Sequence, residues 1–130
     1  MNSNALAPLV LIADDDLSIT LSLQLLFELH GLRAEVAHTP AHTIERVARG
    51  GVGLVVHDMN FSRPATSGAE GLLLFRSLRR RAPKLPIVLI TSWGNAKMRS
   101  AVIDEGASAY LTKPWDDAAL LALAVRLLSA

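Results

Sequence analysis

Short apolar runs of strand length recur five times along this chain of 130 residues, with helix-length segments between and after them. The runs lie at Leu9–Ala13, Ala34–Ala37, Val52–His57, Ile87–Thr91 and Ser108–Thr112. The helix-length segments are residues 17–30, 40–49, 69–82, 95–105 and 116–129. Parallel strands need a long crossover connection, which a helix supplies, so this alternation favours an open parallel sheet. The pattern predicts an α/β fold in which helices cover both faces of a five-stranded sheet.

The segment 17–30 is the one helix whose residue pattern also fits a strand. Its apolar residues from Leu17 to Leu25 alternate with polar ones, which is the period of two expected in a strand. The segment nevertheless runs for about 14 residues without a turn signal, which is too long for a typical strand. Asp16 before it can cap a helix, and Gly31 after it can end one. We therefore predict a helix here.

Composition limits the classes of protein to which this chain can belong. Apolar residues make up 51% of the chain, which is enough for a continuous core. A formal net charge of +1 gives no general attraction to nucleic acid or to a membrane surface, and the lack of cysteine excludes disulfides and thiolate chemistry. No apolar stretch approaches the length of about 20 residues that spans a bilayer, and no signal pattern precedes the first run. These features predict one cytoplasmic domain over residues 1–130, with residues 1–7 loosely held.

Acidic residues directly follow or end two of the apolar runs. Asp14, Asp15 and Asp16 come after the first run, and Asp58 follows the third. The carboxyl ends of parallel strands meet at one edge of the sheet, so these carboxylates are expected to lie close together and to repel one another. Oxygen-rich pockets of this kind suit a hard divalent cation such as Mg2+. The sequence therefore predicts an acidic pocket that binds a metal ion.

The ends of the fourth and fifth runs carry side chains that suit phosphate. Thr91 ends the fourth run, and Thr112 with Lys113 ends the fifth. A hydroxyl group can donate a hydrogen bond to a phosphoryl oxygen, and a lysine ammonium supplies a compact positive charge. Together with the acidic pocket, these residues indicate phosphate chemistry at the carboxyl edge of the sheet.

Four segments, taken in order, carry a resemblance to a known family. They are Val10–Asp16, Leu54–Asn60, Ile87–Ser92 and Gly106–Pro114. With these segments the chain resembles the receiver domain of bacterial two-component response regulators, the family that includes the chemotaxis regulator. The resemblance implies a flavodoxin-like fold of three layers, with a parallel sheet of strand order 2-1-3-4-5 and five helices.

The same resemblance implies roles for the acidic pocket. Asp58 would be the nucleophile that accepts a phosphoryl group from a phosphohistidine and becomes an aspartyl phosphate. Asp14, Asp15 and Asp58 would hold Mg2+, together with the backbone carbonyl of Asn60. The cation offsets the repulsion between these carboxylates and the incoming anion. The domain is accordingly expected to be a phosphoacceptor switch, not an enzyme, with at most a slow loss of its own phosphoryl group.

Roles are also implied for the residues that end the fourth and fifth strands. Lys113 and Thr91 would each contact a phosphoryl oxygen. Thr91 and Tyr110 would form a switch, in which Thr91 moves toward the phosphoryl group and Tyr110 swings inward into the space released. The peptide bond between Lys113 and Pro114 would be cis, a geometry that costs only about 0.5–1 kcal/mol before proline.

Partners follow from the resemblance too. The phosphoryl donor would be a sensor histidine kinase or a phosphotransfer protein. The last helix, 116–129, has an apolar face wider than one core contact requires. That face fits either a homodimer through the fourth helix, fifth strand and fifth helix, or a fragment whose last helix continues toward an output domain. The segments 58–60, 91–94 and 113–115 are similar to receivers of nitrogen-regulation-type transcription activators.

Three other interpretations use the same residues. A phosphatase similar to the haloacid dehalogenases would take Asp14 and Asp16 as its nucleophile motif, but that class needs a further acidic pair late in the fold. A nucleotide or flavin module would need a phosphate loop after the first strand, where three aspartates stand instead. A degenerate receiver would bind its partners without phosphorylation.

Three further features have no fixed role. The stretch Phe61–Gly71 is longer than the usual receiver loop before the third helix, so it is either surface padding or a lid or docking element. Trp93 fits a shield for the phosphoryl group, a partner contact or simple packing on the fourth helix. His57 is expected to be buried under a helix and not to act as a base, because it points to the face opposite that of Asp58.

Overall fold

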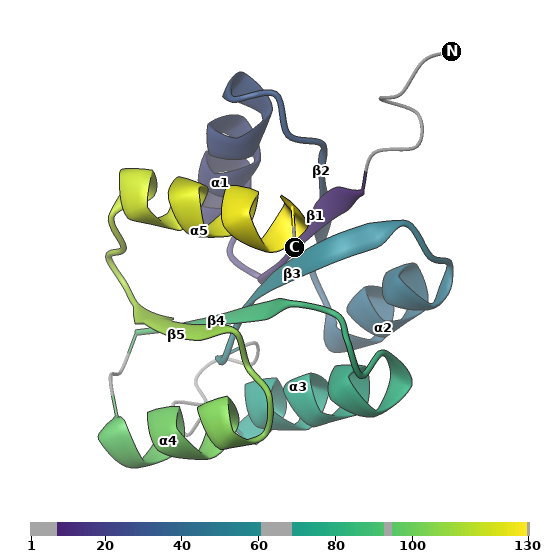
Figure 1. The fold of residues 1–130 in the computed structure, drawn as a ribbon, viewed down its shortest axis with the longest axis vertical. Coiled ribbons are helices and arrows are strands. Elements are labelled where there is room, and N and C mark those ends of the chain that lie inside the picture. The colour runs from purple at the N-terminus through teal and green to yellow at the C-terminus, as the bar shows by residue number, and fades with distance from the viewer. Residues whose placement is uncertain (1–7, 61–68, 93–94, 130) are drawn as a thin grey trace.

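The computed structural model describes residues 8–60, 69–92 and 95–129, and it contains one sheet with helices on both sides (Figure 1). The strands are β1 (Leu9–Ala13), β2 (Ala34–Ala37), β3 (Val52–Asp58), β4 (Ile87–Thr91) and β5 (Ala109–Thr112). The helices are α1 (Leu17–Leu29), α2 (Pro40–Ala48), α3 (Ala69–Arg81), α4 (Ala96–Asp104) and α5 (Asp117–Ser129). All neighbouring strands are parallel, in the order β2-β1-β3-β4-β5. The predicted fold class and strand order are confirmed, and element ends differ from the prediction by at most one residue.

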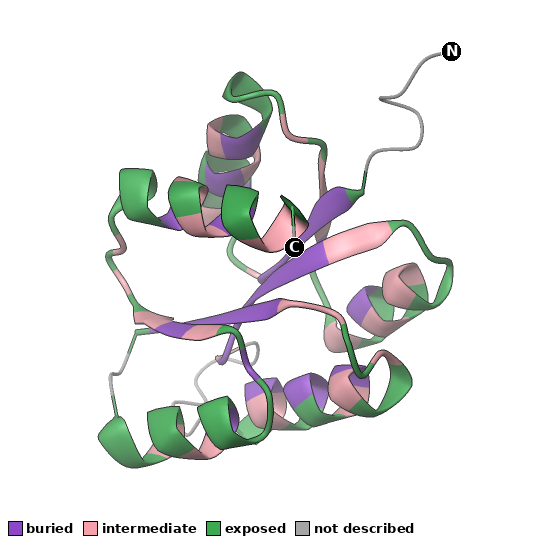
Figure 2. Cartoon of the chain, in the orientation of Figure 1, coloured by how far each residue is buried: buried purple, intermediate pink, exposed green. Residues whose placement is uncertain are grey.

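The core has two halves, one on each face of the sheet. Helices α1 and α5 cover one face, and α2, α3 and α4 cover the other (Figure 1). Successive residues of a strand point to opposite faces, so each central strand supplies both halves. Leu23 and Phe27 of α1 pack on one face with Leu120 of α5, whereas Phe75 of α3 and Val102 of α4 pack on the other. The central strands β1, β3 and β4 are therefore largely buried, the edge strands β2 and β5 are only partly buried, and the outer helix surfaces are exposed (Figure 2).

The segment with the ambiguous period forms helix α1, as predicted. The Asp16 side chain caps it by accepting hydrogen bonds from the backbone N–H groups of Ser18 and Ile19, at 2.9 and 3.2 Å. Gly31 follows the helix with a φ of 81°, a conformation that favours glycine. The misleading alternation arises because α1 carries leucines on its outer surface as well. These exposed residues are Leu17, Leu21, Leu25 and Leu29.

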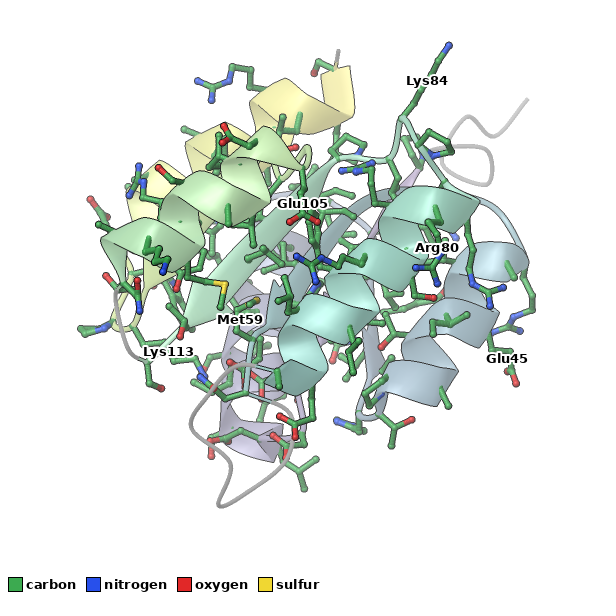
Figure 3. All side chains as sticks on the ribbon, turned by 90° about the horizontal axis from the view of Figure 1, so that it is seen from below. Glu45, Met59, Arg80, Lys84, Glu105 and Lys113 are labelled. Carbon is green, nitrogen blue, oxygen red and sulfur yellow. The ribbon has the colours of Figure 1, made fainter. Side chains whose placement is uncertain are left out.

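Parallel register brings the polar strand ends to one edge of the sheet. Ala13 at the end of β1 is opposite His57 of β3, and Thr91 at the end of β4 is opposite Thr112 of β5. In Figure 3, Lys113 and Met59 lie at this end of the molecule, whereas Lys84 lies at the opposite end. Within the described residues, no helix is both long and apolar enough to cross a bilayer.

Candidate functional site

Three carboxylates form a cluster at the carboxyl edge of the sheet. Asp14 and Asp15 follow β1, and Asp58 is the last residue of β3, the strand next to β1. One oxygen from each of Asp14, Asp15 and Asp58 lies within 4.8 Å of the others. Asp14 and Asp58 are 3% and 4% exposed, so their charges are poorly solvated. The structure thus brings together three of the four acidic residues that the sequence predicted to converge, whereas Asp16 caps α1.

Lys113 enters the same pocket from the loop between β5 and α5. Its Nζ atom lies 3.5 Å from Asp14 Oδ2 and 3.5 Å from Asp58 Oδ1. The backbone N–H of Lys113 donates to the carbonyl of Thr91 at 2.8 Å, which fixes the start of the loop beside β4. The Lys113–Pro114 peptide bond is cis. One cation therefore faces two buried carboxylates.

The pKa values of two carboxyl groups in this pocket are raised, mainly by burial. Burial raises the pKa of Asp14 to about 6, against a hydrogen bond from the Asp16 backbone that lowers it, and repulsion from Asp58 adds to the rise. Burial also raises the pKa of Asp58, although the Lys113 ammonium opposes that shift. The charged form of a buried carboxyl group is stabilised by any further positive charge placed beside it.

The donor set of the pocket fits a small, hard divalent cation. Such ions prefer carboxylate and carbonyl oxygens, and the Asp14, Asp15 and Asp58 carboxylates supply the first kind. Asp58 Oδ1 is buried and has no hydrogen-bond partner among the described residues, although the Lys113 ammonium lies 3.5 Å away. A buried acceptor in this state is open to an additional ligand.

Thr91, Tyr110 and Asn60 form a second, uncharged part of the site. Thr91 and Tyr110 are 3% and 5% exposed. Burial raises the pKa of Tyr110, and a hydrogen bond with Thr91 opposes the rise. The Asn60 side chain donates from Nδ2 to Thr91 Oγ1 at 3.3 Å. Tyr110 is already buried in this structure. The inward swing expected of it on phosphorylation stays a prediction.

Two contacts of the site carried no recognisable signal in the sequence. The backbone N–H of Gly71 donates to the Met59 carbonyl at 3.1 Å, and a Cβ atom at position 71 would lie 2.3 Å from the Met59 Cα atom. Glycine therefore lets α3 approach the backbone just after Asp58. His38 Nδ1 lies 3.1 Å from the Asp14 carbonyl oxygen, which ties the end of β1 to the loop after β2.

Other candidate residues lie outside the pocket or outside the described part of the chain. The Asp16 carboxylate is used as the cap of α1. His57 is 1% exposed, its Nδ1 atom lies 3.0 Å from the Asp58 carbonyl oxygen, and burial lowers its pKa to about 4. The burial of His57 agrees with the prediction that it lies inside the protein. Trp93 and residues 61–68 of the long loop lie outside the described residues.

The late acidic residues do not supply the metal pair that a dehalogenase-like phosphatase needs. Glu105 forms a double hydrogen bond with Arg76, at 2.7 and 2.8 Å. Asp117 accepts from the Trp115 indole at 2.8 Å, and Asp116 accepts from the backbone of Ala118 at 3.0 Å. Among the described residues, the metal-capable acidic group is that of Asp14, Asp15 and Asp58.

Comparisons with known proteins agree with this geometry. The model of the response regulator receiver domain matches residues 10–125. The chain is 31% identical over 113 residues to the transcriptional regulatory protein YkoG of Bacillus subtilis (strain 168), covering 87% of this chain and 47% of YkoG. It is 33% identical over 113 residues to the response regulator MprA of Mycobacterium leprae (strain TN), covering 87% of this chain and 47% of MprA. The crystal structure of a CheY-like receiver domain protein from Methanospirillum hungatei JF-1 matches with a TM-score of 0.83 and 23% identity, over 94% of each chain.

The fold and these matches define a receiver domain of two-component signalling. The chain belongs to the response regulator receiver domain family. Its relatives include transcriptional regulators, and the chain spans less than half the length of YkoG and MprA. The family match favours the receiver interpretation over the phosphatase and nucleotide-binding alternatives. The finer likeness to nitrogen-regulation-type activators stays a prediction.

Proposed function

We propose that Asp58 is the phosphoacceptor of this receiver domain. An Asp58 carboxylate oxygen attacks the phosphorus of a phosphohistidine, the phosphorus–nitrogen bond breaks, and the imidazole leaves with the electron pair of that bond. The observation that supports Asp58 most strongly is its position. Its Oδ1 atom is buried at the end of β3, lies beside the Lys113 ammonium, and has no hydrogen-bond partner among the described residues.

Asp14, Asp15 and Asp58, with the backbone carbonyl of Asn60, are the residues that would hold Mg2+. When bound, the cation supplies positive charge that offsets repulsion between the carboxylates and the phosphoryl group. The raised pKa of Asp14 supports this assignment, because burial leaves this carboxylate poorly solvated even with Lys113 at 3.5 Å.

Lys113 and Thr91 are the proposed contacts of the phosphoryl oxygens. Lys113 Nζ lies 3.5 Å from Asp58 Oδ1, which is within reach of a phosphoryl oxygen attached there. Thr91 ends β4, the neighbouring strand, and carries a hydroxyl that can donate. Its hydrogen bond with Tyr110 links the pocket to β5, so Thr91 and Tyr110 form the proposed conformational switch. The domain acts as a switch, with at most slow loss of its own phosphoryl group.

The proposed donor is a sensor histidine kinase or a phosphotransfer protein, and the proposed readout lies in an output domain or in a dimer. The surface of α4, β5 and α5 is the proposed dimer face. Val125 of α5 is 47% exposed, while Leu120 on the same helix is buried, so α5 carries apolar surface beyond its core contact.

Phosphorylation by a small-molecule donor tests the assignment. The protein is incubated with acetyl phosphate, with and without Mg2+, and its intact mass is measured. We expect one phosphoryl addition that requires Mg2+ and is lost in Asp58→Asn. Asp16→Asn is the matched control, because Asp16 lies in the same acidic run but caps α1, and asparagine caps equally well. Addition that persists in Asp58→Asn would place the acceptor elsewhere.

A further inference from the structure

The imidazole ring of His38 contacts the backbone of the acidic pocket from a different part of the chain. His38 is an exposed residue in the loop between β2 and α2, and its Nδ1 atom lies 3.1 Å from the carbonyl oxygen of Asp14. A carbonyl oxygen can accept a hydrogen bond but cannot donate one, so the ring nitrogen is the donor. The proposed function uses the carboxylate of Asp14 and gives His38 no role.

This hydrogen bond fixes the peptide group that joins Asp14 to Asp15. A peptide group is planar, so the direction of the Asp14 carbonyl also sets the direction of the Asp15 N–H group. The preceding peptide group is held by β2, because the N–H of Asp14 donates to the Ala37 carbonyl at 3.1 Å. The following one is held by the N–H of Asp16, which donates to Asp14 Oδ1 at 2.9 Å. The backbone on both sides of Asp15 is thus fixed in direction, and His38 fixes the side toward β1.

Among the three clustered carboxylates, that of Asp15 depends most on its backbone. The carboxylates of Asp14 and Asp58 each lie 3.5 Å from Lys113 Nζ, and both residues are buried. Asp15 is half-buried, and no hydrogen bond or ion pair within the described residues holds its carboxylate. The direction in which this carboxylate points therefore follows from the backbone that carries it.

We propose that His38 is a positioning residue for the metal site. By donating to the Asp14 carbonyl, its ring fixes the peptide group before Asp15 and directs the Asp15 carboxylate toward those of Asp14 and Asp58. This proposal rests on the proposed function of the pocket as a Mg2+ site. Groups that orient the ligands of a metal contribute to its affinity although they do not touch the ion.

Titration of Mg2+ into the whole chain by calorimetry tests this role, with two replacements of His38. In His38→Asn, the Nδ2 atom is bonded to Cγ as Nδ1 is in histidine, so it can donate in the same place. His38→Leu has no donor. Both replacements remove any charge on the ring, so the difference between them reports the hydrogen bond. We expect His38→Leu to bind Mg2+ about two- to tenfold more weakly than the unchanged chain, and His38→Asn to bind it about as tightly as that chain.

Thr39→Ala is the matched control, because Thr39 follows His38 in the same loop but holds α2. Its Oγ1 atom accepts from the backbone N–H of His42 at 3.0 Å and caps that helix. Loss of this cap should lower the midpoint of urea unfolding and leave the Mg2+ affinity of the folded protein unchanged. A loss of affinity as large as that of His38→Leu would mean that a loosened loop is sufficient, which overturns the proposal.

Equal binding of Mg2+ by His38→Leu and His38→Asn also overturns it, whether both match the unchanged chain or both are weaker. If His38→Leu does not fold, His38→Ala takes its place in the same comparison. Asp14→Asn separates this proposal from the one on which it rests. Affinity for Mg2+ that Asp14→Asn retains in full contradicts the proposed metal site itself, whereas a loss in Asp14→Asn without one in His38→Leu contradicts the role of His38 alone.

Discussion

The ammonium group of Lys113 lies 3.5 Å from the carboxylate of Asp14, yet the pKa of that carboxyl group is raised to about 6. One lysine must serve two buried carboxylates, and burial outweighs its attraction. The metal-free pocket is therefore a source of instability in the folded protein, and this instability can be measured.

Asp14→Asn is expected to stabilise the metal-free protein at pH 7.5 by about 1–3 kcal/mol. The pKa of Asp14 rises from 3.8 in the unfolded chain to about 6 in the folded one, and each unit corresponds to about 1.4 kcal/mol. The folded carboxylate is penalised fully above pH 6, and the penalty disappears as both states become protonated near pH 4. Urea unfolding in EDTA at pH 7.5, 6 and 4.5 measures the gain, which should shrink as the pH falls. A variant less stable than the unchanged chain at pH 7.5 would contradict this account.

His57 is expected to make the protein sensitive to acid. Burial lowers its pKa from 6.5 to about 4, so between these values the unfolded chain binds a proton that the folded chain does not. Stability is thus fully present above pH 6.5 and is lost as the pH falls toward 4, by up to about 3 kcal/mol. Replacement by leucine, which carries no proton, should flatten this dependence.

Asp14 changes the free energy of unfolding in the opposite direction over the same pH range, because its protonation stabilises the folded state as the pH falls. It therefore hides part of the His57 effect. The comparison of His57 with His57→Leu is therefore made by urea unfolding in the Asp14→Asn background. An equally steep loss of stability in the leucine variant would exclude His57 as its source.

Gly71→Ala is expected to damage both the fold and the site. An added Cβ atom would lie 2.3 Å from the Met59 backbone, so α3 must move away from the segment that carries Asn60. Overpacking of this kind typically costs about 1–3 kcal/mol, and we also expect weaker binding of Mg2+. Gly53→Ala is the matched control, because its Cβ atom would meet Pro8 and Leu128 at the other end of β3. It should lower the free energy of unfolding and leave the affinity for Mg2+ unchanged; equal losses of affinity in both variants would point to general destabilisation.

The sequence predicts the parts of the site that depend on strand ends, and misses those that depend on close packing. Asp14, Asp58, Thr91 and Lys113 each stand where a parallel strand finishes, so one topological rule brings them together. The approach of Gly71 to Met59 depends on how deeply α3 sits on the sheet, which no periodicity encodes. The direction of the Asn60 side chain likewise depends on a loop conformation, not on the spacing of residues.

Mg2+ is expected to reverse the instability of the pocket in a pH-dependent way. A ligand that binds only the folded state stabilises it by about 2.7 kcal/mol at a hundred times its Kd. Thermal unfolding in Mg2+ and in EDTA measures this gain, which should be present in Asp16→Asn and strongly reduced in Asp14→Asn. Since the Asp14 carboxyl group must lose its proton to bind a cation, the gain should fall as the pH drops below about 6. A stabilisation by Mg2+ that stays constant down to pH 4.5 would show that the cation does not compete with a proton at Asp14. A stabilisation that Asp14→Asn retains in full would likewise show that the cation binds elsewhere.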